Sequence, residues 1–193
     1  KPKNQINIVR KILKYSLPRH FFLEKPISNT PLRSLNLINL LNQKKIKFST
    51  GYLFKYLKWY KFLKNNLNQN NKFKIVWEIK KNSNNNAWKY NHYEGGGILR
   101  FYSIHFIRAL FDLQITKISK KTINKKQWYI KAQDIKNNSL DICVKFSNIN
   151  RFKFYMNNTK IFAGPNPFLK KIIANNDPRV KIIKNYIKDS LKK

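Results

Sequence analysis

The sequence predicts an α+β protein. Apolar residues recur at helical spacing in much of the first half, whereas the last third alternates apolar and polar residues between Asn-Asn turns. We expect a helical N-terminal half containing one strand, a C-terminal antiparallel β-meander closed by a basic C-terminal helix, and an extended basic N-terminal arm. The expected parts are an arm at 1–33, a helix-rich segment at 34–94, and an α+β segment at 95–193. The last two form either two domains or one continuous domain.

The predicted arm is basic and interrupted by four prolines, at positions 2, 18, 26 and 31. Ile8, Ile12 and Tyr15 share one helical face, which predicts a short helix over 6–15. From 17 to 33 the chain is expected to be extended, because a proline disfavours helix at the residue before it. Such an arm would lie in a groove of a larger partner or remain unstructured.

Three helices are expected in the middle of the chain. The first covers 34–41, and the second begins after the N-cap candidates Ser49 and Thr50 and ends at residue 63 or 64. The third covers 98–113 and follows a glycine triplet, Gly95–Gly97, which predicts a hinge. The triplet does not match a P-loop, because Ile98-Leu99-Arg100 follows it instead of Gly-Lys-Ser/Thr.

Strand patterns dominate the remainder. Expected strands cover 72–81, 115–119, 127–135, 140–146, 151–156 and 159–163. The pairs Asn137-Asn138 and Asn157-Asn158 suit tight turns, because Asn tolerates a positive φ. Pro167 and Pro178 each predict a helix start, and the second helix is expected to run through Leu191.

The charge is strongly one-sided. The 193 residues include 41 Lys and Arg against 8 Asp and Glu, a formal net charge of +33. Frequent Lys, Asn and Ile indicate an AT-rich genome, but this bias does not explain 34 Lys against 3 Glu. Because 42% of the residues are hydrophobic, the chain is not a disordered basic tail. So large a positive charge predicts a polyanionic partner.

Few residues offer chemistry other than binding. A single cysteine, Cys143, excludes an internal disulfide and is expected to be half-buried in a strand. No apolar run is long enough to cross a membrane. His92 with Glu94, joined by His105, is the one candidate for a nuclease-type site. We expect no catalytic residue, no metal site, no cofactor and no small-molecule substrate, and hence a protein that is not an enzyme.

Binding residues are expected among the cations and the exposed aromatics. Arg is more informative than Lys, because its planar guanidinium binds phosphate bidentately. The predicted RNA-binding residues are Lys55, Lys58, Lys61, Lys64, Arg100, Arg108, Lys120, Lys121, Lys125, Lys126, Arg151, Lys153, Lys170, Lys171 and Arg179. Base stacking is expected from Trp88, Tyr90 and Tyr93, whereas Trp59, Trp77 and Trp128 are expected in the core.

In its basic, aromatic and acid-poor composition, the chain resembles ribosomal proteins encoded by AT-rich mitochondrial genomes. Its run Gly95–Gly97, Arg100, Tyr102 is similar to the glycine triplet of a large-subunit ribosomal family. The resemblance implies a structural protein of the mitochondrial ribosome, located in the matrix, with rRNA and neighbouring ribosomal proteins as partners. Two alternatives remain: a peripheral subunit of an organelle membrane complex, and an organelle nucleic-acid-processing enzyme.

Overall fold

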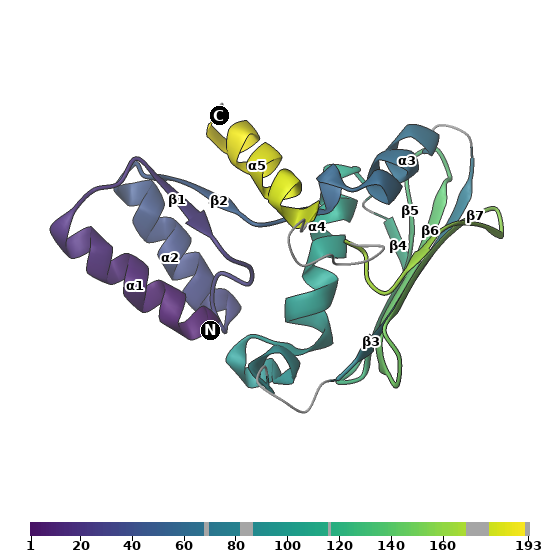
Figure 1. Cartoon of the computed structure of the whole chain (residues 1–193), viewed down its shortest axis with the longest axis horizontal. Coiled ribbons are helices and arrows are strands. Elements are labelled where there is room, and N and C mark those ends of the chain that lie inside the picture. The colour runs from purple at the N-terminus through teal and green to yellow at the C-terminus, as the bar shows by residue number, and fades with distance from the viewer. Residues whose placement is uncertain (68–69, 82–86, 116, 169–177, 192–193) are drawn as a thin grey trace. The chain divides into compact units, whose positions relative to one another are not determined.

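The computed structural model describes residues 1–67, 70–81, 87–115, 117–168 and 178–191. Its contacts divide the chain into two compact units (Figure 1). Unit 1 comprises 1–52 and 82–102, and unit 2 comprises 53–81 and 103–193. Each unit is described below by itself. The domain boundaries expected from the sequence, at 33/34 and 94/95, stay a prediction.

Unit 1 begins with alternating helices and strands: α1 (Pro2–Tyr15), β1 (His20–Leu23), α2 (Pro31–Gln43) and β2 (Lys47–Thr50). The two strands pair in parallel, from His20 opposite Lys47 to Leu23 opposite Thr50. Parallel strands need a crossover connection, which α2 provides. This helix starts where its sequence favours a start, with Pro31 in the first turn and the Thr30 side chain accepting from the Arg33 amide.

The first 33 residues are part of this fold, so the prediction of an extended arm is wrong. Ile6 and Val9 of α1, Leu23 of β1, and Leu37 and Leu41 of α2 form one buried cluster. The prolines end the helices and strands locally, but the apolar residues between them pack against one another. Unit 1 continues with short helical turns at Ala87–Tyr90 (η2) and His92–Glu94 (η3). A π-helical turn follows at Ile98–Ser103 (η4).

Unit 2 is built on one six-stranded sheet. In chain order its elements are η1 (Phe54–Tyr56), α3 (Lys58–Asn66), β3 (Lys72–Lys80), α4 (Ile104–Asp112), β4 (Lys117–Ile123), β5 (Gln127–Gln133), β6 (Ser139–Ser147), β7 (Arg151–Met156), β8 (Thr159–Gly164) and α5 (Pro178–Leu191). The strands lie in the order β4-β5-β6-β3-β7-β8. Because β3 lies between β6 and β7 and is parallel to β6, the sheet is mixed. The predicted purely antiparallel meander is therefore wrong.

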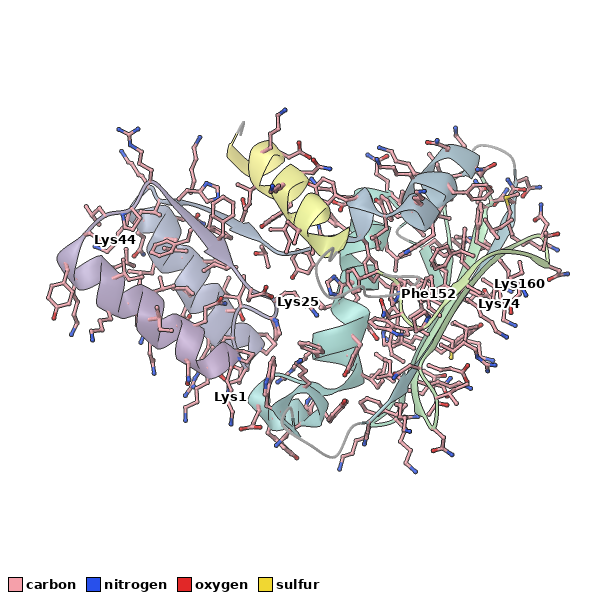
Figure 2. The ribbon with its side chains drawn as sticks, viewed as in Figure 1. Lys1, Lys25, Lys44, Lys74, Phe152 and Lys160 are labelled. Carbon is pink, nitrogen blue, oxygen red and sulfur yellow. The ribbon has the colours of Figure 1, made fainter. Side chains whose placement is uncertain are left out.

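One face of this sheet carries the core. Phe152 and Phe154 of β7 are fully buried, and Trp59 of α3 lies 5.3 Å from the Phe152 ring. On α4, Phe106 contacts Trp77 with ring centroids 6.2 Å apart. Figures 1 and 2 show α3 and α4 on the side of the sheet to which Phe152 points, whereas Lys74 lies on the other side. This two-residue alternation is the one that the sequence predicted.

Several further predictions are confirmed. The strands at 72–81, 127–135, 140–146, 151–156 and 159–163 are present with small shifts, as is the C-terminal helix. Asn137, Asn157 and Asn158 have positive φ angles. The helix predicted from residue 52 to residue 63 or 64 is present but starts later: Ser49 and Thr50 belong to β2, and α3 begins at Lys58. The helix expected at Pro167 falls mainly on 169–177, outside the described residues.

Candidate functional site

The most unusual side chain of the described residues is Lys25 of unit 1. It lies two residues beyond the carboxyl end of β1, followed by a cis peptide bond to Pro26. Ligands of open α/β units bind at the carboxyl ends of parallel strands. Lys25 therefore occupies a position where a parallel strand pair presents functional side chains.

The loop that carries Lys25 is held by one glutamine of α1. The Gln5 side-chain amide donates to the carbonyl oxygens of Glu24 and Ile27, both at 3.0 Å. Its side-chain oxygen accepts from the Glu24 amide at 2.8 Å. These three hydrogen bonds fix the backbone on both sides of Lys25, which limits the positions that its side chain can reach.

The ammonium group of Lys25 contacts a single residue of the π-helical turn. Its Nζ atom donates to the carbonyl oxygen of Phe101 at 2.5 Å and lies 3.8 Å from the centroid of the Phe101 ring. π-helical turns are rare and occur frequently at functional sites. No carboxylate makes an ion pair with Lys25 in the described part of the chain, so the charge is balanced by a carbonyl dipole and a ring face.

This environment changes the acidity of Lys25. Burial lowers its pKa from 10.5 to about 7, Glu24 opposes the change, and the charge of Lys89 adds to it. Near neutral pH about half of the molecules therefore carry an uncharged amine at this position. A desolvated lysine of this kind is a proton acceptor or a nucleophile, unlike the solvated lysines on the surface.

The glycine triplet precedes the π-helical turn whose Phe101 contacts Lys25. A Cβ atom on Gly96 would lie 2.0 Å from the Trp88 carbonyl oxygen, and one on Gly95 would lie 2.9 Å from the Asn29 Cα. Gly95 and Gly97 also have φ angles of 89° and 82°. The triplet thus permits close backbone packing immediately before the turn that carries Phe101. The predicted hinge is a tightly packed junction.

Arg100 belongs to the same junction. Its Nη1 atom donates to the carbonyl oxygens of Asn29 and His92, at 2.6 and 3.1 Å. The guanidinium therefore joins the loop after Lys25 to the turn before the glycines. The Nη1 atom is thus directed at the protein's own backbone. The assignment of Arg100 to RNA binding stays a prediction.

The aromatic residues predicted to stack on bases have different environments. The Trp88 ring packs edge-on against Phe101 at 5.2 Å, and Tyr90 stacks on Tyr102 at 6.4 Å. Tyr93 is 80% exposed. Trp88 and Tyr90 thus pack against the turn that carries Phe101, the residue in contact with Lys25. Trp59, Trp77 and Trp128 are buried, which confirms their predicted place in the core.

The remaining predicted cations are scattered over unit 2. Arg108 pairs with Asp112 at 2.8 Å, Arg151 pairs with Glu78 at 2.5 Å, and Lys55 lies 3.8 Å from Asp189. Lys153 is half-buried, and the exposed lysines are Lys58, Lys61, Lys64, Lys120, Lys121, Lys125 and Lys126. Lys170 and Lys171 lie outside the described residues, as does the side chain of Arg179 in α5. A binding role for the exposed lysines stays a prediction.

The residues of the nuclease-type grouping are divided between the two units. Glu94 makes an ion pair with Lys1 at 3.2 Å. His105 is buried in unit 2, where its ring stacks on Phe54 with centroids 4.6 Å apart. Within the described ranges there is no group of three or more His, Cys, Asp and Glu residues that could hold a metal ion. Cys143 is half-buried, as predicted.

Sequence reasoning missed Lys25. The signal was present, since three apolar residues at 21–23 precede the charged pair Glu24-Lys25 and then Pro26. This is the end of a short strand followed by a turn, but one lysine among 34 did not stand out. Among the described residues, moreover, no helix is both long enough and apolar enough to span a bilayer.

Comparison with known proteins identifies the fold. No family model matches the chain, and no curated protein matches it in sequence. A WlbA (WbpB) dehydrogenase from Thermus thermophilus, solved with NAD and alpha-ketoglutarate, covers 93% of this chain, with a TM-score of 0.63 and 12% identity. The same dehydrogenase, solved with NAD and UDP-GlcNAcA, covers 83%, with a TM-score of 0.61 and 13% identity.

Two further structures extend the comparison. A dehydrogenase (MviM) from Clostridium difficile covers 81% of the chain with a TM-score of 0.58 and 17% identity. A super-repressor mutant of Gal80p from Saccharomyces cerevisiae covers 81% with a TM-score of 0.63 and 9% identity. The chain spans between 51% and 62% of the length of these four structures.

These similarities overturn the ribosomal interpretation. The prediction of a ribosomal protein with rRNA and ribosomal partners is wrong. The two alternative functions are also wrong, as is the expectation that the protein is not an enzyme. A strong positive charge is compatible with many folds, because net charge does not determine a fold. The mitochondrial location stays a prediction. In fold, the chain is similar to part of these dehydrogenases and of Gal80p.

Proposed function

We propose that this chain belongs to an NAD-dependent oxidoreductase in which Lys25 transfers the proton of a substrate hydroxyl group. The observation that carries the proposal is the lowered pKa of Lys25, held at the carboxyl end of a parallel strand by Gln5 and faced by Phe101. The similarity in fold to dehydrogenases solved with NAD supports it.

The chemistry of alcohol oxidation requires such a group. Converting a hydroxyl carbon to a carbonyl removes a proton from oxygen and a hydride from carbon. The uncharged Lys25 amine accepts the proton, and the Phe101 carbonyl and ring stabilise the resulting ammonium ion. In the reverse direction the ammonium ion returns the proton to the carbonyl oxygen. A pKa of about 7 suits both directions near neutral pH.

Bound NAD would supply the acceptor for the hydride. The glycine triplet of this chain does not suit the phosphates of that cofactor, because the space beside Gly95 and Gly96 is filled by the backbone of Asn29 and Trp88. We therefore assign no NAD-binding residue to this chain and derive only the role of Lys25. A polyhydroxylated substrate is the class suggested by the UDP-GlcNAcA complex of the Thermus dehydrogenase.

The test is NAD reduction by the purified protein with a panel of polyols, sugars and UDP-sugars. We expect Lys25→Met to lower kcat by about 100-fold or more, which is the usual contribution of a general base. Lys44→Met is the matched control, because Lys44 is an exposed lysine of the same unit. It should leave kcat unchanged.

The pH dependence makes the test specific. In the oxidation direction kcat should rise through pH 7 in the wild-type protein, as Lys25 loses its proton. Lys25→Met should lack this rise. Full activity of Lys25→Met would contradict the role of Lys25. A folded protein that binds NAD but reduces it with no member of the panel would contradict the function itself.

A further inference from the structure

Unit 2 contains a basic groove that the proposed oxidoreductase function does not use. The groove has a volume of about 540 Å³ and is lined by Lys80, Lys81, Lys126, Phe146, Ser147 and Asn148. It lies where the parallel strands β3 and β6 both end, since Lys80 is paired with Ser147 in their register. Lys126 enters from the turn between β4 and β5.

The backbone around this groove is held in place by internal hydrogen bonds. The Phe146 amide donates to the Lys126 carbonyl oxygen at 2.9 Å, and the Lys80 amide donates to the Asn150 side chain at 2.9 Å. The Lys126 amide donates to the side chain of Asn124 at 2.8 Å. These three amides are therefore engaged, and a ligand in the groove would be bound mainly by side chains.

The charges that line the groove are all positive. Three lysines contribute ammonium groups, and no carboxylate is among the lining residues. Glu78, the acidic residue of β3, shares a face with Lys80 but is engaged by Lys145 at 3.3 Å and by Arg151 at 2.5 Å. Lys81 lies 4.3 Å from the centroid of the Phe146 ring, which fixes one ammonium group at the wall. Ser147 and Asn148 add uncharged hydrogen-bond donors.

We propose that this groove binds a small multivalent oxyanion, either a phosphate-bearing or a polycarboxylate metabolite. Its volume is that of a small-molecule site, larger than a single ion needs. A bound anion would offset the mutual repulsion of Lys80, Lys81 and Lys126 and accept hydrogen bonds from their ammonium groups. The groove lies within unit 2, so the proposal for it does not depend on the role of Lys25 in unit 1.

The experiment titrates the full chain with inorganic pyrophosphate, citrate and chloride, following backbone amide signals by NMR. The groove variant combines Lys80→Gln, Lys81→Gln and Lys126→Gln. The control combines Lys117→Gln, Lys120→Gln and Lys160→Gln, which removes the same charge from exposed strand positions of the same unit. Because all six side chains are exposed, both variants should fold, and circular dichroism checks that they do.

We expect pyrophosphate and citrate to bind saturably, with the largest shifts at Phe146 and Ser147, and chloride to produce no saturable shift. The groove variant should lose affinity about tenfold or more, because three charge-assisted contacts are removed. The control should stay within about twofold of the wild type, because it loses long-range attraction only.

Three results would overturn the proposal. Equal losses in the two variants would show diffuse attraction to a chain of net charge +33. Shifts that increase linearly with pyrophosphate would show that no site exists. A DNA duplex that binds the wild type and loses affinity in the groove variant, while pyrophosphate binding does not change, would assign the groove to nucleic acid. If the groove variant, but not the control, loses affinity about tenfold for pyrophosphate or for citrate, the affected ligand identifies the oxyanion class that the groove prefers.

Discussion

The lowered pKa of Lys25 predicts an unusual dependence of stability on pH. The unfolded chain binds the Lys25 proton up to about pH 10.5, whereas the folded protein releases it near pH 7. Between these values the unfolded state binds more protons, so raising the pH favours the folded state. The two pKa values differ by an amount equivalent to about 5 kcal/mol. From pH 7 to pH 9 the contribution of Lys25 should be about 2 kcal/mol.

The perturbation that isolates this contribution is Lys25→Met, which removes the titrating group and keeps an unbranched side chain. Urea unfolding should be followed at Trp88, because it is the one tryptophan of unit 1. ¹⁹F NMR of fluorotryptophan-labelled protein can resolve its signal from the other three. The free energy of unfolding of Lys25→Met should exceed that of the wild type by the largest margin near pH 6. This margin should shrink as the pH rises.

The comparison of unfolding free energies should stop at about pH 9.5, below the pH at which unfolded tyrosines ionise. Burial raises the pKa of Tyr60 to about 12, and stability from such tyrosines falls once the unfolded tyrosines ionise near pH 10. Within the range, parallel stability profiles for the wild type and Lys25→Met would refute the reasoning. They would mean that Lys25 is protonated in the folded protein at every pH tested.

Three further substitutions test the packing of the two units by urea unfolding. Glu78→Gln should destabilise unit 2 by about 1–2 kcal/mol at pH 7, because Glu78 is buried against Lys145 and Arg151. Hydrogen bonds and charge from Arg151 and Lys145 lower the pKa of Glu78, so this stabilisation is lost as the pH falls through that lowered pKa and the two curves should converge in acid. A gap that does not narrow would contradict the ion pair. Asn138→Ala should destabilise unit 2 by about 2–3 kcal/mol, because the Asn138 side-chain oxygen accepts a hydrogen bond from the Asn71 amide at 2.7 Å. A neutral effect would contradict that contact. Gly96→Ala should destabilise unit 1 by about 1–3 kcal/mol, read at Trp88, because its Cβ would meet a backbone oxygen; unchanged stability would mean that the junction is loose.

The local structure was largely predictable from the sequence, whereas strand pairing was not. Alternation at 72–80 identified β3 and its buried face, and Asn157 and Asn158 identified the turn between β7 and β8. Alternation states which face of a strand is buried but does not state which strand lies beside it. The place of β3 between β6 and β7 depends on contacts about 70 residues apart in the chain, and no local pattern encodes them.

The candidate site was hidden for a similar reason. Lys25 becomes unusual only when Gln5, from α1, fixes its loop and Phe101, from a distant turn, covers its ammonium group. Neither contact is visible in a chain where Lys is common. Arg100 and the glycine triplet were correctly singled out as unusual, but their partners are backbone groups of the same unit.

The proposed proton transfer requires that Lys25 be largely uncharged just above neutral pH. The most direct measurement is an NMR titration of the lysine side-chain Cε and Nζ signals, with Lys25 assigned by its loss in Lys25→Met. One lysine signal is expected to titrate with a midpoint of about 7, and to be the signal that disappears in the variant. A Lys25 midpoint near 10.5, together with those of the other lysines, would contradict the proposed proton transfer.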